Sequence, residues 1–161
     1  MVGPSFPPPA AFHFAIAFDL NVIDSSFQEI SGLKAEWGTE DVQEGGQNRF
    51  VHRLPTRTKF SNLVLKRGVV RLTSPLAYWL SDCFSGDFIG NPVVPKLVNV
   101  LLLDGRHRPV VHWQVEGAYP LAWEHSTLDS MQNSLLVETV ELSYRYFERH
   151  TFAYPDEVFG S

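Results

Sequence analysis

Residues 12–20 read FHFAIAFDL, and large apolar side chains occupy every second position. The larger apolar residues, which share one face, are Phe12, Phe14, Ile16, Phe18 and Leu20, and the other face carries His13, Ala15, Ala17 and Asp19. Alternation with a period of two is typical of a β-strand that buries one face in a core. The segment therefore predicts a half-buried strand.

Further β patterns follow along the chain. Residues 27–37 are strand-like in part, and the segment EDVQEGGQN after them carries the Gly45–Gly46 pair expected at a hairpin turn. A strand should return through residues 50–54, where Pro55 limits its hydrogen-bond ladder. Asp104–Gly105 predicts a second hairpin. The other segments with β patterns are 63–70, 96–103, 109–116, 118–123 and 134–147.

One helix is predicted between these strands. Ser74 suits its N-cap, Pro75 its first position and Gly86 its end. The apolar residues recur at helical spacing, at Leu76, Trp79, Leu80, Cys83 and Phe84. Seven or eight strands with one short helix favour a small antiparallel β-barrel or sandwich, with the helix flanking or plugging one opening.

The composition suits a single domain of ordinary size. The chain has 161 residues, of which 44% are hydrophobic and 19% charged, and its formal net charge is -5. An acidic balance argues against a surface built throughout for phosphate backbones. Cys83 is the single cysteine, so no internal disulfide forms, and a reducing compartment suits assembly. No apolar run approaches the ~20 residues of a membrane-spanning helix.

A search for catalytic and metal-binding patterns returns nothing. The sequence contains no GxSxG, P-loop, GxGxxG, HExxH or CxxC pattern. Its six histidines are scattered without the short spacing of metal ligands. Cys83 lies on the apolar face of the predicted helix, which favours packing over catalysis. Glu138 and Glu141 have no recognisable acid–base partner and are interpreted as solvated surface, although Glu138 interrupts an apolar face of residues 134–147.

Charge is distributed unevenly along the chain. Residues 45–81 carry a net charge of +7, whereas residues 1–44 and 82–161 each carry -6. One interpretation is a basic surface that meets an acidic surface of the next subunit in a head-to-tail assembly. A second is a local nucleic-acid groove that includes Phe50 and Phe60. A third is cross-strand pairing of basic and acidic residues within one barrel.

Six segments in order carry a resemblance to a known family. They are FHFAIAF, FQEISGL, EGGQNRFVHRLPTR, NLVLKRG, WQVEGAYPLAW and ETVELSY. Over about residues 12–148 they resemble the tube proteins of contractile phage tails and of related bacterial contractile injection systems. The resemblance implies a small β-barrel with a flanking helix, similar to the type VI secretion tube protein. It also implies a structural protein and not an enzyme.

The resemblance further implies hexameric rings that stack into a hollow inner tube or initiate it on the baseplate. The expected partners are copies of the chain, other tube, sheath and baseplate proteins, and luminal cargo, without specific nucleic acid or membrane insertion. Assembly is expected in the bacterial cytoplasm, within a phage tail or a tail-like particle that is released in some systems. Residues 12–20 and 134–147 are then expected to build barrel and ring, and residues 36–59 to reach a neighbouring ring.

Within the reaching segment we expect a subunit or inter-ring interface formed by Glu44, Arg49, Arg53, Arg57 and Lys59. No catalytic, cofactor-binding or metal-binding residue is expected. The expected division is a proline-rich lead-in at 1–11, a tail-tube-like β-barrel domain at 12–148 and a C-terminal extension at 149–161. The alternative is a stand-alone β-barrel binding module with a local basic nucleic-acid groove.

Overall fold

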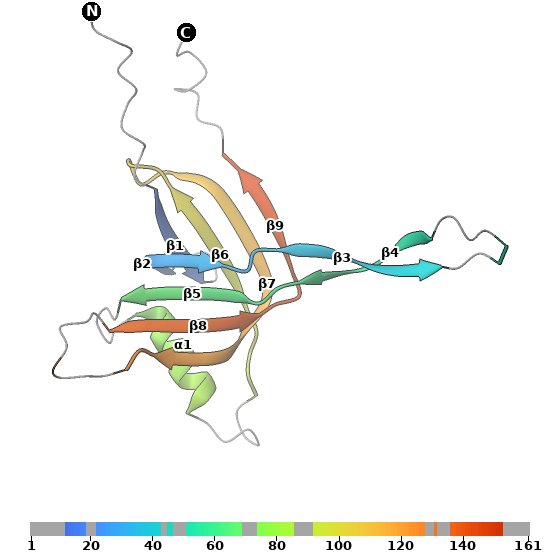
Figure 1. The fold of residues 1–161 in the computed structure, drawn as a ribbon. Helices are drawn as coiled ribbons and strands as arrows, with labels where there is room; N and C mark the ends of the chain where they lie inside the picture. The colour runs from blue at the N-terminus through green and yellow to red at the C-terminus, as the bar shows by residue number, and fades with distance from the viewer. Residues whose placement is uncertain are drawn as a thin grey trace, which may run out of the picture.

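The computed structural model describes residues 12–18, 22–42, 45–46, 51–68, 74–85, 92–127, 131 and 136–152. These residues form nine β-strands and one α-helix (Figure 1). The elements are β1 (His13–Phe18), β2 (Val22–Ser31), β3 (Ala35–Val42), β4 (His52–Phe60), β5 (Leu63–Gly68), α1 (Pro75–Phe84), β6 (Lys96–Leu103), β7 (Pro109–His125), β8 (Val137–Ser143) and β9 (Tyr146–Thr151).

Antiparallel pairing closes most of these strands into a barrel-like sheet. The order is β6-β1-β2-β5-β8-β7-β9, and β6 also pairs with β7, so the sheet returns to its first strand. The length of β7 makes this possible, because its first part pairs with β6 and β9 and its last part with β8. The prediction of a small antiparallel barrel or sandwich with one helix is therefore confirmed.

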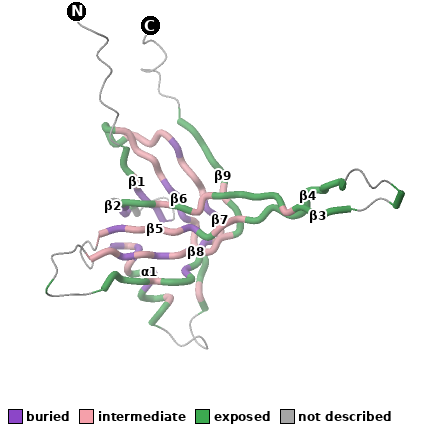
Figure 2. The backbone as a smooth tube through the Cα atoms, in the orientation of Figure 1, coloured by how far each residue is buried: buried purple, intermediate pink, exposed green. Residues whose placement is uncertain are grey.

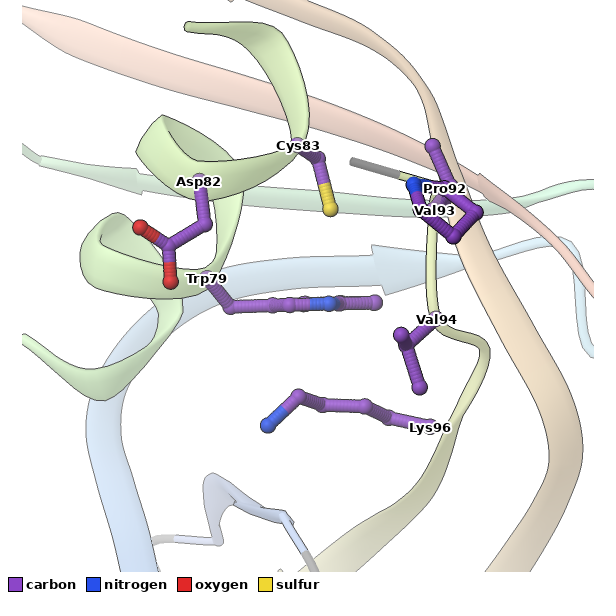
Figure 3. A pocket seen from close by; sticks show the side chains of 7 residues that line it. All are labelled: Trp79, Asp82, Cys83, Pro92, Val93, Val94 and Lys96. Atoms are coloured by element: carbon purple, nitrogen blue, oxygen red, sulfur yellow. The ribbon is translucent and has the colours of Figure 1, made fainter. Parts of the chain in front are cut away.

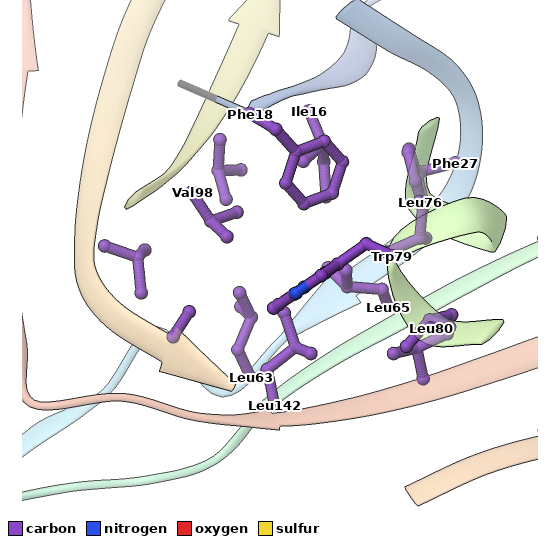
Figure 4. Close-up of a cluster of buried hydrophobic side chains, with 14 residues drawn as sticks. Ile16, Phe18, Phe27, Leu63, Leu65, Leu76, Trp79, Leu80, Val98 and Leu142 are labelled. Carbon is purple, nitrogen blue, oxygen red and sulfur yellow. The ribbon is translucent and has the colours of Figure 1, made fainter. Parts of the chain in front are cut away.

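The core fills the inside of this sheet, and α1 covers it on one side (Figure 4). Strand residues such as Ile16 and Leu63 are completely buried there. The helix contributes Leu76, Trp79 and Leu80, which Figure 4 shows pointing into the same cluster. Leu76, Trp79 and Leu80 of the predicted apolar stripe thus complete the core and Cys83 packs against it, whereas Phe84, at the end of the helix, is 47% exposed and lies outside the core.

The start of α1 also confirms the prediction. Ser74 is the N-cap, and its Oγ accepts a hydrogen bond from the backbone N–H of Ala77 at 3.0 Å. Pro75 occupies the first turn, where its missing N–H has no partner to lose. Ser85 is the C-cap, and the predicted stop at Gly86 lies outside the described residues.

β1 differs from the prediction of a half-buried strand because both of its faces are covered. Ala15 is 0% and Ala17 6% exposed, beside Ile16 at 0%, whereas Phe12, just before β1, and His13 at its start are exposed. β1 lies between β2 and β6, and the small alanines lie among larger cross-strand neighbours such as Leu101, which is paired with Ala15. Leu20 lies outside the described residues.

The strand that returns from the first hairpin is longer than predicted. It runs past Pro55, which lies opposite Thr39 near an irregularity in the register. Within the described residues β4 pairs with β3 alone, so one of its edges makes no ladder. Proline is tolerated on such an edge, because the N–H that it lacks is not needed there.

Two other strand boundaries also differ. Residues 109–116 and 118–123 belong to one strand, β7, which passes through Gly117 at a φ of 64° that favours glycine. The segment predicted at 134–147 instead contains β8 and the start of β9, which meet at a corner, and residues 134 and 135 lie outside the described residues. There the backbone N–H of Arg145 donates to the carbonyl of Glu116 at 2.9 Å, which directs the chain along β7.

Candidate functional site: a projecting arm and an open sheet edge

β3 and β4 form a two-stranded arm that extends away from the barrel (Figures 1 and 2). Figure 2 shows it exposed along almost its whole length, and only Gly38 and Phe60 are half-buried. Trp37 is 69% exposed and Leu54 is 54% exposed. An isolated hairpin has little stability of its own in water, so an arm with exposed large apolar side chains is suited to contact with a partner.

Three of the five predicted interface residues are described, and they lie on this arm. Arg53, Arg57 and Lys59 are all on β4 and all exposed. Glu44 and Arg49 lie outside the described residues. The structure therefore brings the three described residues together on one strand of the arm.

Two of these cations face acidic residues across the arm. Arg53 lies opposite Asp41, with its Nε 3.4 Å from Asp41 Oδ1. Lys59 lies opposite Glu36, whose carboxylate forms an ion pair with Lys34. The hydrogen bond and charge of the Lys34 ammonium, with a smaller effect of Lys59, hold the pKa of the Glu36 carboxyl below its usual value.

Arg57 has no ion-pair partner among the described residues. The described part of the arm is nevertheless balanced in charge, because Glu36, Glu40 and Asp41 on β3 match the three cations of β4. The described part of the arm thus presents opposite charges side by side, together with the guanidinium of Arg57, which has no ion-pair partner there. Such a pattern favours a partner whose own charges match it in one register. It does not favour a partner with a uniform negative charge.

The two other described cations of the basic segment, Lys66 and Arg67, belong to β5 in the barrel wall. Lys66 pairs with Glu29 on the outside of the sheet at 3.2 Å. Arg67, the next residue, points the other way and is 2% exposed. Cross-strand pairing of basic and acidic residues within one barrel, the third interpretation of the uneven charge, is therefore present in the structure.

Arg67 is the centre of a buried polar network. Its Nη1 donates to Asp24 Oδ2 at 2.8 Å and its Nη2 to Ser74 Oγ at 2.7 Å, while its Nε contacts Glu138. Glu138 also accepts from Trp123 Nε1 at 2.7 Å. Because Ser74 is the N-cap of α1, the network connects the helix to the barrel wall.

The interpretation of Glu138 as solvated surface is wrong, since it is 4% exposed. It lies opposite Arg67 in the register of β5 and β8. A signal for the pair exists in the sequence: Arg67 follows Leu63 and Leu65 on one apolar face, and Glu138 interrupts another. Opposite charges that interrupt two apolar faces indicate a buried ion pair.

β9 is the second candidate contact surface. In the described part of the chain it pairs with β7 alone, and every residue of β9 except Phe147 is exposed. The outer side of an edge strand offers a row of backbone donors and acceptors to another strand. This edge is therefore a template for pairing with another chain.

A pocket of about 290 Å³ lies beside α1 (Figure 3). Its lining residues are Trp79, Asp82, Cys83, Pro92, Val93, Val94 and Lys96. Burial, followed by the charge of Asp82, raises the pKa of the Cys83 thiol, so it stays protonated and is a poor nucleophile. The described residues include no group of three or more His, Cys, Asp or Glu that could hold a metal ion. Among them, no helix has the length and apolar character needed to cross a membrane.

The described part of the chain thus combines a barrel-like sheet, one flanking helix and an exposed arm. The T4-like virus tail tube protein gp19 family matches residues 10–148. The chain therefore belongs to this family. No curated protein is significantly similar to it in sequence.

Solved structures agree with this assignment. A chain of the anti-feeding prophage (AFP) baseplate, determined by cryo-EM with 6-fold symmetry, is 28% identical with a TM-score of 0.68, and the match covers 94% of this chain and 98% of that chain. A chain of the PVC sheath–tube complex, an extracellular contractile injection system in its extended state, is 20% identical with a TM-score of 0.72 over 92% and 95%. A type six secretion system protein shares the fold at 12% identity, with a TM-score of 0.52 over 86% and 83%.

Family membership confirms the resemblance found in the sequence. The chain is a structural tail-tube protein of a phage-tail-like contractile particle and not an enzyme. The alternative of a stand-alone module with a basic groove loses its basis. The basic segment is divided between arm and barrel, and Phe60 packs against Tyr144 and Phe147.

Proposed function

We propose that the chain forms hexameric rings that stack into the hollow inner tube of a contractile injection system, or that initiate this tube on the baseplate. The relative at 28% identity comes from a baseplate with 6-fold symmetry, and it matches the present chain over nearly the full length of both. The fold is shared with a chain of a sheath–tube complex. These relatives support copies of the chain, other tube proteins, sheath and baseplate as partners.

The observation that carries the proposal is the exposed arm. It projects from the barrel and exposes Trp37 and Leu54, so a neighbouring ring gives these side chains a place to be buried. The predicted interface residues, Glu44, Arg49, Arg53, Arg57 and Lys59, supply its charged part. Opposite charges on adjacent strands then fix the register in which rings meet.

The edge of β9 supports closure of each ring. An unpaired edge that joins a different surface of the next subunit makes a heterologous contact, and repetition of that contact closes a ring when the rotation fits. The same contact removes the hazard of an exposed edge.

The proposal includes a division of the chain and a place of assembly. The tube domain covers residues 12–148, with a lead-in at 1–11 and an extension at 149–161, whose first residues complete β9. The single cysteine suits assembly in the bacterial cytoplasm. The finished tube carries cargo in its lumen.

The interface role of Arg53 is tested by reversing charges in a cycle. The variants are Arg53→Glu, Asp41→Arg and the two substitutions together, called the double exchange. The double exchange restores an ion pair within the arm, but the two charges that a partner meets have changed places. Arg57→Glu probes a cation without a described partner, and Arg106→Glu, on the exposed β6–β7 turn, is the matched control. Rings and tubes are counted by negative-stain microscopy after circular dichroism confirms folding.

We expect Arg57→Glu and the double exchange to reduce stacking, and Arg106→Glu to leave it unchanged. Full recovery of tubes by the double exchange would show that Arg53 serves only its pair with Asp41. Particles that remain 18 kDa monomers at all concentrations, even with tube and baseplate partners, would reject the ring itself.

A further inference from the structure

The arm is joined to the barrel by two short crossings. Residues 32–34 connect β2 to β3, and residues 61–62 connect β4 to β5. Gly32 has a φ of 90°, and a Cβ at this position would overlap the carbonyl oxygen of Asn62. The two crossings are therefore in close contact, and the N–H of Ser61 donates to the carbonyl of Lys34 at 3.1 Å.

Beyond these crossings the extensive contacts of β3 and β4 are with each other. Side chains along the described length of the arm are mostly exposed, whereas those of the barrel strands are packed between their neighbours. The direction in which the arm projects therefore depends on the two crossings, which together form the stem of the arm.

Tyr144 reaches the stem from the corner between β8 and β9. Its hydroxyl donates to the carbonyl of Gly32 at 3.0 Å, across 112 positions of sequence. Burial raises the pKa of this hydroxyl, which keeps it protonated as a donor. A second hydrogen bond runs from Asn62 Nδ2 to Glu141 Oε1 at 2.7 Å, so β8 and its corner contact both crossings.

Three aromatic rings pack around the same point. The ring of Phe60, at the end of β4, lies 5.9 Å from that of Tyr144 and 5.6 Å from that of Phe147. Tyr144 and Phe147 are 6.2 Å apart. Rings at such separations and steep angles attract one another beyond simple burial. Because Phe147 belongs to β9, the cluster joins the arm to the open edge strand.

We propose that Phe60, Tyr144 and Phe147, the stem clamp, fix the direction of the arm relative to the barrel, and that Tyr144 is the positioning residue. The clamp holds the arm at the angle that a neighbouring ring must meet. This consequence for tubes rests on the proposed function, whereas the direction of the arm does not.

The test measures arm direction and tube formation separately. Spin labels are placed on cysteines that replace the exposed His52, on the arm, and Arg106, on the barrel, in a Cys83→Ser background. Labelled chain is diluted with unlabelled chain, and double electron–electron resonance gives the distance distribution. The variants are Tyr144→Phe, which removes one hydroxyl, and Phe60→Leu, which removes one ring. Tyr146→Phe, an exposed tyrosine two residues further on, is the matched control.

We expect the parent and Tyr146→Phe to show one narrow distance peak, and Tyr144→Phe and Phe60→Leu to lose it while circular dichroism remains unchanged. Tube counts should fall with the loss of the peak. A narrow peak in both clamp variants would overturn the proposal, whatever happens to the tubes. A lost peak with normal tube counts would support the clamp and reject the role of the arm in stacking.

Discussion

Arg53 and Arg67 belong to the same basic segment, yet their surroundings are opposite. Arg53 lies on the exposed arm and faces Asp41 at 3.4 Å in open solvent. Arg67 lies inside the barrel wall, 2% exposed, with bonds to Asp24, Ser74 and Glu138. Water and salt screen the ion pair between Arg53 and Asp41. The buried guanidinium of Arg67 is shielded from both, so its charge is compensated only by the groups that contact it.

The difference shows that one run of cations serves two purposes. In the barrel a cation is held because removing it would leave buried carboxylates without compensation. In the arm a cation adds little to folding and is available to a partner. Position within the basic segment does not separate the two kinds of cation. The flanking residues do, because Arg67 continues the apolar face of Leu63 and Leu65.

The largest expected effect comes from removing Arg67. Arg67→Ala leaves the carboxylates of Asp24 and Glu138 buried without the guanidinium that both contact, which should lower the free energy of unfolding by about 3–5 kcal/mol. Lys66→Ala, at the next position, loses an exposed pair worth ~0–1 kcal/mol. Urea denaturation of both variants measures the contrast. Equal losses would show that burial does not distinguish the two cations.

A somewhat smaller effect is expected from the apolar side of the same core. Leu80 is completely buried on α1. Leu80→Ala should lower the free energy of unfolding by ~2–5 kcal/mol through lost burial and the cavity left behind. Trp37→Ala, on the exposed arm, is the control and should leave the barrel as stable as before. An unchanged melting midpoint for Leu80→Ala would show that the core does not depend on the helix.

Local periodicity predicts where the first strand and the helix lie. β1 and the helix from Pro75 are found where the pattern puts them, although β1 is covered on both faces and not on one. The hairpin around Gly45–Gly46 follows from turn chemistry in the same way.

Features that depend on distant residues are not predicted. The corner between β8 and β9 is set by Arg145 and Glu116, which a periodic pattern does not connect. Glu138 lies opposite Arg67 in the sheet register, so its burial is indicated only when two distant segments are compared, each with a charge in an apolar face. The stem clamp likewise depends on a contact between Tyr144 and Gly32, which are 112 positions apart in the sequence.

The third prediction concerns assembly, with little effect on folding. Changing Arg49, Arg53 and Arg57 together to Glu should abolish stacking, because attraction becomes repulsion at every copy of the interface. Exposed pairs contribute only ~0–1 kcal/mol each, so the barrel should stay folded by circular dichroism. Microscopy counts the assembled tubes. Normal assembly would assign the charges to the solvated surface of the arm.

The smallest effect expected is a difference in salt dependence between two carboxylates, one on the arm and one on the barrel. Lys34 chiefly lowers the pKa of Glu36, whereas a backbone hydrogen bond from Arg108 chiefly lowers that of Asp104, at the β6–β7 turn. A lowered pKa in the folded state means that each carboxylate contributes stability above its unfolded pKa. That contribution is lost as the pH falls through the folded pKa.

Salt should separate the two because it screens an exposed charge far more than a short backbone hydrogen bond. In NMR titrations of the side-chain carboxyl carbons, added salt should raise the pKa of Glu36 toward its ordinary value. The pKa of Asp104 should change less. Lys34→Met should reproduce the effect of salt on Glu36 and leave Asp104 unchanged. If both carboxylates respond equally to salt, exposed charge pairing is not what distinguishes the arm from the barrel.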